Sequence, residues 1–470
     1  PKGWKVATAL KPATDNAQGW GTYEAANYDA LIDHPVELGT FWHGEFTVRG
    51  VRHEFVVAGA TDDFDGQRLL DDTRRICEAQ IAFWHGRRKV PFDHYVFMLN
   101  VVDDGYGGLE HRQSTALICG RRDLPRTGRA LNKDSYTTLL GLISHEYFHT
   151  WNVKRLKPVE FAPYDYTQEN FTRMLWFFEG FTSYYDDQFL LRTGLIDAPT
   201  YLKLLSKTIN QVLSTPGRLA YSVGQASFDA WTRYYRQDEN TANATVSYYT
   251  KGSLVALALD LTLRQLPATV EGGQSPSLDG VMLRLWKLGR AITQADVAQA
   301  LADEAGQAPP AQVFSAPASL DVLGCWRALL DAWTEGCDDL PLPALLRTQG
   351  VDWHTQAGSL PQRLGARIGE RSGAQQVLAV MHGSVAEQMG LSTGDELLAL
   401  GEWRIKRADD LAQWHDASRA QPLLVSRDQR VLTLTLPVLS ATGGDTVVLT
   451  VANTPVDAQA LTRRAAWLKA

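Results

Sequence analysis

Residues 139–155 read LLGLISHEYFHTWNVKR, and this stretch decides the fold around the candidate site. Its apolar residues recur at helical spacing and predict a buried helix over the whole range. Because His145 and His149 are four residues apart, a helix places both imidazoles on one face, about 5–6 Å apart between Cβ atoms, close enough to hold one metal ion. Glu146, one step round the helix, would face a water bound there. Burying these groups is costly unless a metal or strong partners satisfy them.

A catalytic zinc takes three protein ligands, so a third ligand is required. Glu179 is the best candidate, because it lies in the apolar run LWFFEGFT (residues 175–182) on a second helix, predicted over Asn170–Arg192. An unpaired carboxylate is expensive there, and an exposed helical glutamate is the alternative interpretation. Asp186, two turns further along the same face, could accept the outer N–H of a ligating histidine. A solvated aspartate beside Asp187 is the alternative.

Length and composition indicate a folded protein of more than one domain. The 470 residues exceed what one core organises, so about two to four domains are expected. A net charge of -7 gives no basic surface for nucleic acid. No apolar run approaches the roughly 20 residues of a membrane span. The four cysteines predict buried free thiols, and a Cys325–Cys337 bridge is the alternative.

The chain changes character along its length. Alternating apolar runs predict strands within residues 4–57, and residues 200–345 are mainly helical. Further elements are predicted as a helix at 67–85, strands at 94–101 and 114–119, and helices at 251–266 and 294–305. A stretch with Pro and Gly at 338–361 indicates a linker. A compact unit follows, with short strands at 377–380, 396–400, 422–426 and 430–437 and a helix near 409–417.

Several motifs, taken in order, resemble the M61 glycyl aminopeptidase family, a relative of the M1 aminopeptidases among the gluzincins. They are YDALIDHPVELG (28–39), GGLEH (107–111), HEYFHTWNVKR (145–155), EGFT (179–182) and SYYTKGSLVALALD (247–260). Their joint occurrence is far more specific than an HExxH pattern alone. The resemblance covers most of the chain.

The resemblance implies a multidomain α+β fold. Its expected parts are a partial N-terminal β domain (1–58), a thermolysin-like zinc peptidase catalytic domain (59–225), a helical domain completing the active site (226–345), a PDZ domain (360–440) and a C-terminal extension (441–470). The chain begins at Pro1 and not at Met, and members of the family usually begin with more β structure. We therefore expect an N-terminus that is trimmed or partly disordered.

The resemblance also implies an oxyanion donor. Tyr249 lies in YTKG, which is similar to the YxKG pattern that presents a phenol to the oxyanion in M1-like enzymes. Tyr248 is the immediate competitor for this role. Two tyrosines with only structural hydroxyl bonds are the alternative.

Recognition of the substrate amine is expected at GGLEH, which stands where M1-like enzymes carry GxMEN. Glu110 would bind the free ammonium, and Gly107 and Gly108 would let an edge backbone run close to an extended peptide. His111 in place of Asn, and the lack of the Met, depart from the M1 pattern and make M61 the closer comparison. Without the family, the same residues indicate only a turn.

The C-terminal unit is similar to bacterial PDZ domains. GSVA (383–386) followed by GLSTGDELL (390–398) matches their signature, with Val385 in place of the usual Pro. A peptide C-terminus is the partner expected in a groove between residues 366–369 and the helix near 409–417. Because residues 364–367 (LGAR) form only a loose carboxylate loop, a structural or docking role stays open.

Together these features predict a zinc-dependent (Zn²⁺) aminopeptidase that removes small N-terminal residues, Gly or Ala, from peptides with a free N-terminus. Its zinc ligands would be His145, His149 and Glu179, with Glu146 activating the attacking water. A zinc endopeptidase with PDZ-assisted substrate delivery is the alternative, and a non-enzymatic PDZ adaptor is disfavoured because every expected catalytic residue is present. The compartment is left open, with a soluble cytoplasmic protein favoured over a periplasmic one.

Overall fold

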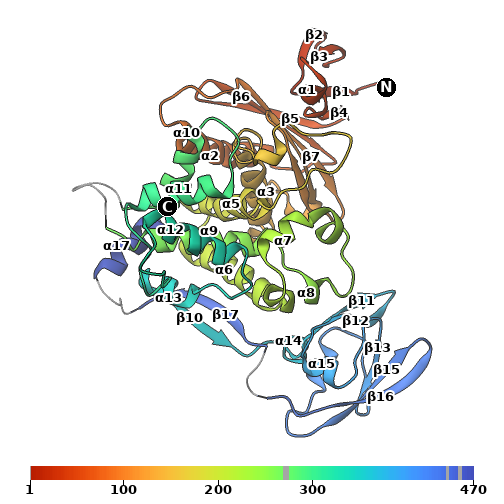
Figure 1. Ribbon diagram of the computed structural model, residues 1–470. Coiled ribbons are helices and arrows are strands. Elements are labelled where there is room, and N and C mark those ends of the chain that lie inside the picture. Colours follow the sequence, from red (N-terminus) through yellow and green to blue (C-terminus); the bar gives the residue numbers. More distant parts are fainter. Residues whose placement is uncertain (1, 268–274, 441–443, 454–457, 470) are drawn as a thin grey trace.

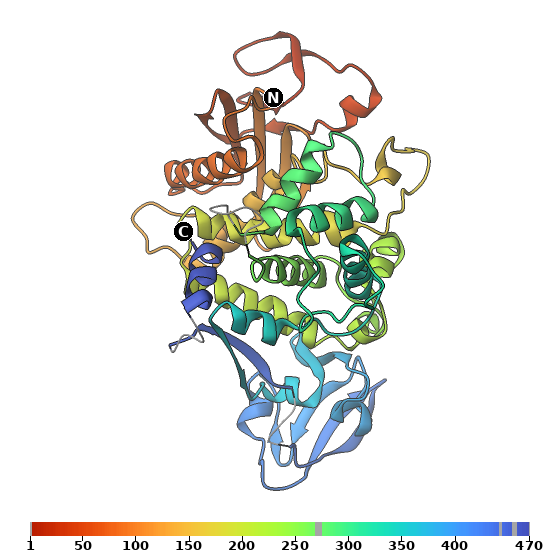
Figure 2. The same cartoon turned by 60° about the vertical axis from the view of Figure 1, so that its left-hand side comes forward.

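The computed structural model describes residues 2–267, 275–440, 444–453 and 458–469, and it shows a mixed α+β chain of several parts (Figure 1). Small sheets of the N-terminal residues lie at one end of the molecule. Helices fill the middle, and a β-rich C-terminal unit lies at the opposite end, as a second view also shows (Figure 2).

The N-terminal arm, residues 5–39, is built of two small hairpin-like sheets and one short helix. β1 (Lys5–Thr8) pairs antiparallel with β4 (Val36–Gly39), and β2 (Lys11–Asp15) pairs antiparallel with β3 (Gly21–Glu24). Between β3 and β4 lies α1 (Tyr28–Ile32), which begins after Asn27 because that side chain accepts a hydrogen bond from Ala30 N. The strands were predicted, whereas α1 was not.

A five-stranded mixed sheet follows, in the order β5-β6-β7-β9-β8. Its strands are β5 (Trp42–Val48), β6 (Val51–Ala58), β7 (His94–Val102), β8 (Gly107–Glu110) and β9 (Ser114–Gly120). β6, β7 and β9 are parallel neighbours, and α2 (Gly66–His85) makes the crossover from β6 to β7. The sheet therefore crosses residue 58, where we had placed a domain boundary. β8 runs antiparallel to β9 at the edge of the sheet.

Two predicted helices differ in their bounds. α3 spans Lys133–Phe148 and not 139–155, because Asn132 caps its first turn and the chain turns back after Phe148. The second helix begins at Leu175 and not at Asn170, since Asn170 closes a loop by hydrogen bonds with the backbone of Asp165. It is interrupted at Glu179, which separates α4 (Leu175–Phe178) from α5 (Gly180–Arg192).

The middle of the molecule is helical, as predicted. Its α-helices are α6 (Ala198–Leu213), α7 (Val223–Phe228), α8 (Thr241–Ala244), α9 (Thr250–Leu263), α10 (Leu278–Lys287), α11 (Gln294–Ala305), α12 (Val322–Thr334) and α13 (Leu342–Thr348). Shorter turns are η1 (Arg121–Asp123), η2 (Val159–Phe161), η3 (Pro216–Leu219) and the π-helix η4 (Ala230–Tyr234). α9 is buried from Lys251 to Leu263, so it is the central helix around which the others pack.

α5 and α9 cross at a pair of glycines. A Cβ on Gly180 would lie 2.5 Å from the backbone of Gly252, and a Cβ on Gly252 would lie 2.5 Å from the carbonyl oxygen of Trp176. Real side chains do not approach backbone this closely, so only glycine at both positions lets the two helices come together. This contact sets the distance between Glu179, just before α5, and Tyr249, just before α9.

The predicted linker at 338–361 is wrong. It contains α13 and β10 (Val351–Gln356), and β10 pairs antiparallel with β17 (Thr446–Val451) from the end of the chain. The side chain of Asn210 on α6 bonds both the N–H and the carbonyl of Val447 in β17. The C-terminal residues thus return to the helical body. Parts of the predicted 441–470 extension (441–443, 454–457 and 470) lie outside the described residues.

The C-terminal unit is inserted between β10 and β17 and has its own hydrophobic core. Its elements are α14 (Leu360–Leu364), β11 (Ala366–Arg371), β12 (Ala374–Val380), α15 (Val385–Gln388), β13 (Glu396–Leu400), β14 (Trp403–Arg404), α16 (Asp410–Gln413), β15 (Gln421–Arg427) and β16 (Arg430–Leu436). The antiparallel sheet runs β11-β12-β13-β15-β16, with β14 beside β13. All predicted strands are present, and the predicted helix at 409–417 is shorter.

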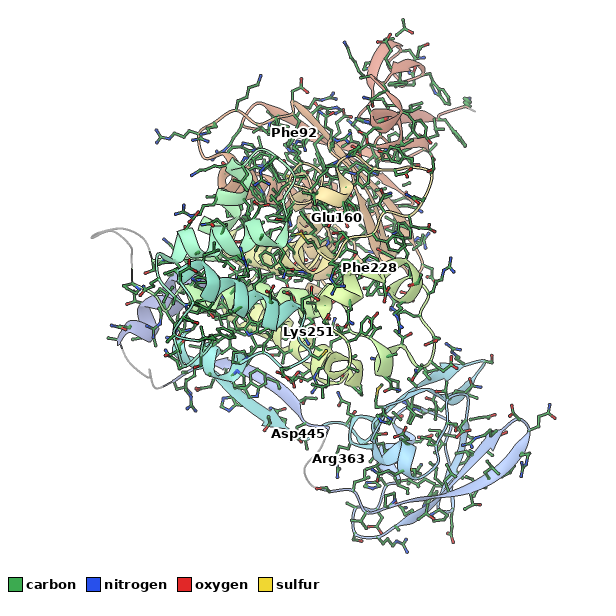
Figure 3. All side chains as sticks on the ribbon, viewed as in Figure 1. Phe92, Glu160, Phe228, Lys251, Arg363 and Asp445 are labelled. Atoms are coloured by element: carbon green, nitrogen blue, oxygen red, sulfur yellow. The ribbon has the colours of Figure 1, made fainter. Side chains whose placement is uncertain are left out.

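Among the described residues, hydrogen bonds join the two ends of the unit to each other and connect the unit to Asn243 on α8. Arg363 donates to the carbonyls of Leu439 and Ser440, and it lies near Asp445 where the unit joins the β10–β17 ribbon (Figure 3). On the other side, the Asn243 side chain bonds Val380 O and His382 N, at 2.9 and 2.8 Å.

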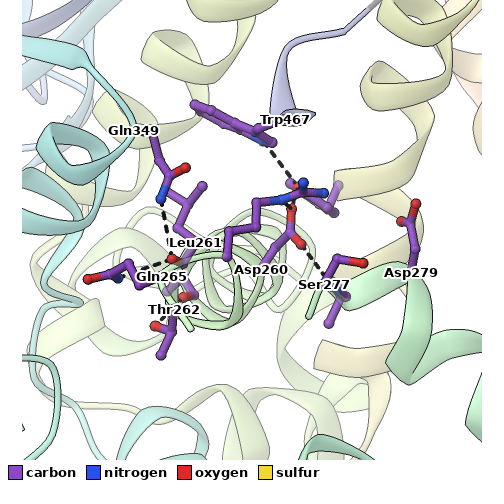
Figure 4. Close-up of polar contacts among 12 residues, drawn as sticks. Asp260, Leu261, Thr262, Gln265, Ser277, Asp279, Gln349 and Trp467 are labelled. Atoms are coloured by element: carbon purple, nitrogen blue, oxygen red, sulfur yellow. Dashed lines mark hydrogen bonds and ion pairs between the residues drawn. The ribbon is translucent and has the colours of Figure 1, made fainter. Parts of the chain in front are cut away.

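A buried polar network ties the last helix, α17 (Ala458–Trp467), to the helical body (Figure 4). Asp260 on α9 accepts hydrogen bonds from Tyr184 Oη at 2.6 Å and from Leu278 N at 2.8 Å, and it pairs with Arg264. The indole N–H of Trp467 donates to Tyr184 Oη at 3.3 Å. α5, α9, α10 and α17 therefore share one polar contact inside an apolar surrounding.

Two other expectations concern the described residues as a whole. Among the described residues, the cysteines at 77, 119, 325 and 337 are free thiols, so the alternative Cys325–Cys337 bridge does not form. Among the helices that the structure describes, none is long and apolar enough to cross a membrane.

We predict that Trp467→Ala lowers the free energy of unfolding of the helical body by about 3–5 kcal/mol, because it leaves a large cavity and removes a hydrogen bond to Tyr184. Leu461→Ala, on the same helix but 39% exposed, is the matched control and should change the stability little. Urea unfolding followed by circular dichroism measures both. Equal stability of the two variants would show that α17 does not contribute to the core.

Candidate metal centre

Three side chains from three parts of the fold converge on one point. His145 lies in the last turn of α3, His149 directly follows that helix, and Glu179 lies at the junction of α4 and α5. One ligand atom from each lies within 4.8 Å of the others. Glu179 Oε2 lies 3.5 Å from His145 Nε2 and 3.3 Å from His149 Nε2. The sequence predicted this set, and the break at Glu179 turns its carboxylate toward the histidines.

Each histidine is oriented by an acceptor on its other ring nitrogen. His145 Nδ1 lies 3.0 Å from Asp186 Oδ2, and His149 Nδ1 lies 2.7 Å from the carbonyl oxygen of Asn152. Because carboxylate and carbonyl oxygens only accept, both Nδ1 atoms carry a proton, which leaves each Nε2, turned toward Glu179, as the ring atom that would bind a metal ion. Asp186 was predicted to act in this way.

The burial of the three groups tests whether they suit a metal ion. His149 is 1% exposed, and Glu179 Oε2 is a buried oxygen without a hydrogen-bond partner in the described residues. Burial raises the pKa of Glu179, but the imidazoles of His149 and His145 outweigh it and hold the pKa at about 2. Two inward-facing Nε2 atoms and one ionised carboxylate form an N₂O donor set of the kind that holds catalytic zinc through three protein ligands.

Glu146 lies beside this cluster and is 4% exposed, and its Oε2 likewise finds no hydrogen-bond partner among the described residues. Burial raises the pKa of its carboxyl to about 7, although His149 and His145 act against this shift. A carboxyl group with a pKa near neutrality can take up and release a proton during a reaction at neutral pH.

The edge strand β8 covers Glu146. A Cβ on Gly108 would lie 2.1 Å from Glu146 Oε1, so a larger residue fits there only if the Glu146 side chain moves. A Cβ on Gly107 would meet no described atom within 4 Å. The two glycines that the sequence paired therefore differ, because Gly108 makes room for the Glu146 side chain, whereas a side chain at Gly107 would point into open space.

Glu110, at the end of β8, reaches the same place. One ligand atom each from Glu110, Glu146 and His149 lie within 4.8 Å of one another. Two carboxylates this close in a buried site repel each other, and the Glu110 charge contributes to the raised pKa of Glu146. A cation that sat between them would relieve this repulsion.

Tyr249 lies beside His145. The two rings stack at an angle of 27°, with centroids 6.3 Å apart. Burial raises the pKa of the Tyr249 phenol, followed by the nearby Glu179, so the hydroxyl stays protonated and can donate a hydrogen bond. Tyr248 is 1% exposed and stacks on Tyr249, at 4.8 Å between ring centroids. Of the two competing tyrosines, Tyr249 is the one whose ring stacks on His145.

Sequence reasoning missed several residues that hold these groups in place. The Asn152 side chain donates to Phe178 O and to Thr182 Oγ1, so it connects His149 to the α4–α5 junction. Gly180 and Gly252 set the helix crossing described above. Both glycines lie inside the motifs EGFT and YTKG, which was the available signal, but the contact joins residues far apart in sequence.

Comparisons with known proteins agree with this geometry. The chain matches the M61 glycyl aminopeptidase domain over residues 138–255 and the peptidase M61 N-terminal domain over residues 1–40. A crystal structure of an aminopeptidase N family protein from Idiomarina loihiensis is 34% identical, covers 99% of this chain and 77% of its own, and superposes with a TM-score of 0.84. A comparison with curated protein sequences found no match.

A mutant M1 zinc metallopeptidase from Deinococcus radiodurans, bound to a Tyr-Ser-Ala substrate, is more distant. It is 14% identical, with 73% of this chain and 63% of that chain covered and a TM-score of 0.44. Likeness at this level is too weak to establish a shared fold.

We predict that Asp186→Asn weakens zinc binding by about 10- to 100-fold, because the amide orients His145 less well than the carboxylate does. Asp134→Asn is the control. Asp134 lies on α3, as His145 does, and forms an exposed ion pair with Lys203, so this variant should bind zinc as the unmodified protein does. Competition with a chelating dye measures the affinity. Equal affinity in both variants would mean that the Asp186–His145 bond does not support the metal.

Proposed function

Because the chain belongs to the aminopeptidase family that these matches define, the M61 glycyl aminopeptidases, we propose that it is a zinc aminopeptidase that removes small N-terminal residues, glycine and alanine, from peptides. The family is one of peptide hydrolases. The single observation that carries the finer proposal is the position of Glu110, whose carboxylate lies within 4.8 Å of the ligand atoms of Glu146 and His149. A second carboxylate at that point can bind the free ammonium of a substrate, and a peptide cleaved at an internal bond brings no ammonium to that position.

Zinc would be held by His145, His149 and Glu179, with Asp186 and the carbonyl of Asn152 fixing the imidazoles. When bound there, the ion would polarise the scissile carbonyl and lower the pKa of a water molecule. The convergence of two imidazole Nε2 atoms and a buried carboxylate oxygen without a hydrogen-bond partner in the described residues supports this assignment.

Glu146 would act as the general base and acid. Its raised pKa lets it take the proton of the attacking water and return it to the leaving amine. Tyr249, protonated and facing the same centre from the side of His145, would donate a hydrogen bond to the oxygen on which negative charge develops.

Glu110 would bind the ammonium group of the substrate. The ammonium would lie next to Glu146 and offset the repulsion between the two carboxylates, forming charge-assisted hydrogen bonds. Since Glu110 ends the edge strand β8, an extended peptide that lies along β8 would place its first residue at this carboxylate and its first peptide bond at the metal. The small size of the residue removed is proposed from the description of the family.

For the rest of the chain, we propose an N-terminal β domain, a thermolysin-like catalytic domain, a helical domain and a PDZ domain. The antiparallel sheet of residues 366–436, with its own core, supports the last of these. β11 is the edge strand on the side where a peptide C-terminus is expected in such domains.

We predict that Glu110→Gln lowers kcat/KM for glycyl-arylamide by at least about tenfold, because a charge-assisted hydrogen bond to the substrate is lost. Acetyl-glycyl-arylamide has no ammonium, so its slow hydrolysis should change little. Steady-state kinetics on both substrates, with zinc content measured in parallel, give the ratio that matters.

Two results would contradict this proposal. If the unmodified enzyme hydrolyses the acetylated substrate as fast as the free one, the protein is an endopeptidase and not an aminopeptidase. If Glu110→Gln leaves the ratio between the two substrates unaltered, Glu110 does not bind the amine.

A second prediction uses the two adjacent glycines. Gly108→Ala should lower kcat by about 100-fold, because the new methyl group displaces the Glu146 carboxylate from its place beside the metal. Gly107→Ala, one residue away and without a described atom within 4 Å of the new Cβ, should retain near-normal kcat. Zinc content should stay stoichiometric in both. A similar kcat for the two variants would show that the Glu146 position is not set by β8.

A further inference from the structure

The N-terminal arm packs Ala7 of β1 against the main sheet, and beside the site it docks through the charges around α1. Every residue of α1 is at least partly exposed, and Tyr28 and Leu31 are 63% and 49% exposed. Asp33, which directly follows α1, is 6% exposed. A segment that exposes its apolar side chains and buries a carboxylate is held by the partners of that carboxylate.

Those partners come from the two segments that flank the candidate site. Asp33 Oδ1 lies 2.8 Å from Lys154 Nζ and 3.4 Å from His111 Nδ1, and Asp33 Oδ2 accepts from the backbone N–H of Arg112 at 3.1 Å. Burial alone raises the pKa of Asp33, but the bonds from His111 and Lys154 outweigh it, so the pKa lies well below the usual range. Asp33 is therefore an ionised, fully engaged group.

His111 and Arg112 directly follow Glu110 and form the turn between β8 and β9. The His111 N–H donates to Ser114 O, and Glu110 pairs with Thr115 across the strands. From the other side, the Arg155 guanidinium donates to Arg112 O at 2.9 Å and to Thr150 O at 2.6 Å. The turn is held between Asp33 of the arm and Arg155, which follows the HExxH segment.

A clamp at this turn fixes the strand end that carries the Glu110 carboxylate. β8 is only four residues long and is an edge strand, paired on one side with β9. Such a short edge has few backbone hydrogen bonds of its own to hold its end in place. The backbone bond from Arg112 N and the side-chain bond from His111 to Asp33 supply that restraint.

We infer that Asp33 is a positioning residue for Glu110, so that the N-terminal arm completes the site that recognises the substrate ammonium. This inference rests on the proposed function. It assigns the arm a part in substrate selection, because the arm sets where the first residue of a peptide is anchored. Asp33 acts through the His111–Arg112 turn and does not itself contact the substrate.

The test is Asp33→Asn, which keeps the size of the side chain and removes its charge. With the zinc enzyme, kcat/KM for glycyl-arylamide should fall about tenfold or more relative to acetyl-glycyl-arylamide, because a small misplacement of the anchor spoils its alignment. The ratio between the two substrates does not depend on the folded fraction. A loss of folded protein would lower both rates equally and leave the ratio unchanged.

Two further variants sharpen the result. Asp29→Asn is the matched control, since Asp29 lies on the same arm and pairs with the guanidinium of Arg112. The Asp29 side chain is more exposed, at 38% against 6% for the Asp33 side chain. Its ratio should stay within about twofold of normal, as expected for an exposed pair. Combining Asp33→Asn with Glu110→Gln should give the same ratio as Glu110→Gln alone, because both changes act on one interaction.

An unchanged ratio in Asp33→Asn, an equal loss in Asp29→Asn, or additive losses in the double variant would each overturn the inference. These outcomes differ from failure of the proposed function, in which the unmodified enzyme itself would not distinguish the free from the acetylated substrate.

Discussion

Two imidazoles and a carboxylate point their ligand atoms at one another inside the hydrophobic core, and keeping them there constrains the rest of the catalytic body. Such a cluster is stable only if each outer ring nitrogen has an acceptor and the inner atoms share a cation. Asp186 and the carbonyl of Asn152 provide the acceptors. The aromatic residues around α3 and α5 hold the two segments against each other and so keep the ligand atoms close together.

Close approach between backbones brings the remaining groups to this cluster. Glycine at 180 and 252 lets α5 and α9 touch, which places Tyr249 over His145. Glycine at 108 lets the edge strand lie over Glu146 and carry Glu110 to within 4.8 Å of it. Each group of the proposed site therefore depends on a different element. The geometry is set by contacts at which a single methyl group would not fit.

Sequence periodicity was sufficient for features that repeat over one or two helical turns. It predicted the strands near the site, most of the helices, and the placement of His145, His149 and Asp186 on common faces. It was insufficient where distant segments meet. The predicted linker contains β10, which pairs with the distant strand β17. The second helix begins later than predicted because the Asn170 side chain closes a loop with the backbone of Asp165. The bond network of Asp33 joins residues far apart in the chain, so no local pattern shows it.

The central claim is that His145, His149 and Glu179 bind one metal ion and that Glu110 binds the substrate ammonium beside it. A crystal structure of the zinc-loaded protein with a non-hydrolysable glycyl phosphinic analogue, recorded at the zinc absorption edge, tests it directly. We predict one anomalous peak bounded by His145, His149 and Glu179, with the ammonium of the analogue on the Glu110 carboxylate. A peak elsewhere, or an ammonium that points to solvent away from Glu110, would contradict the account.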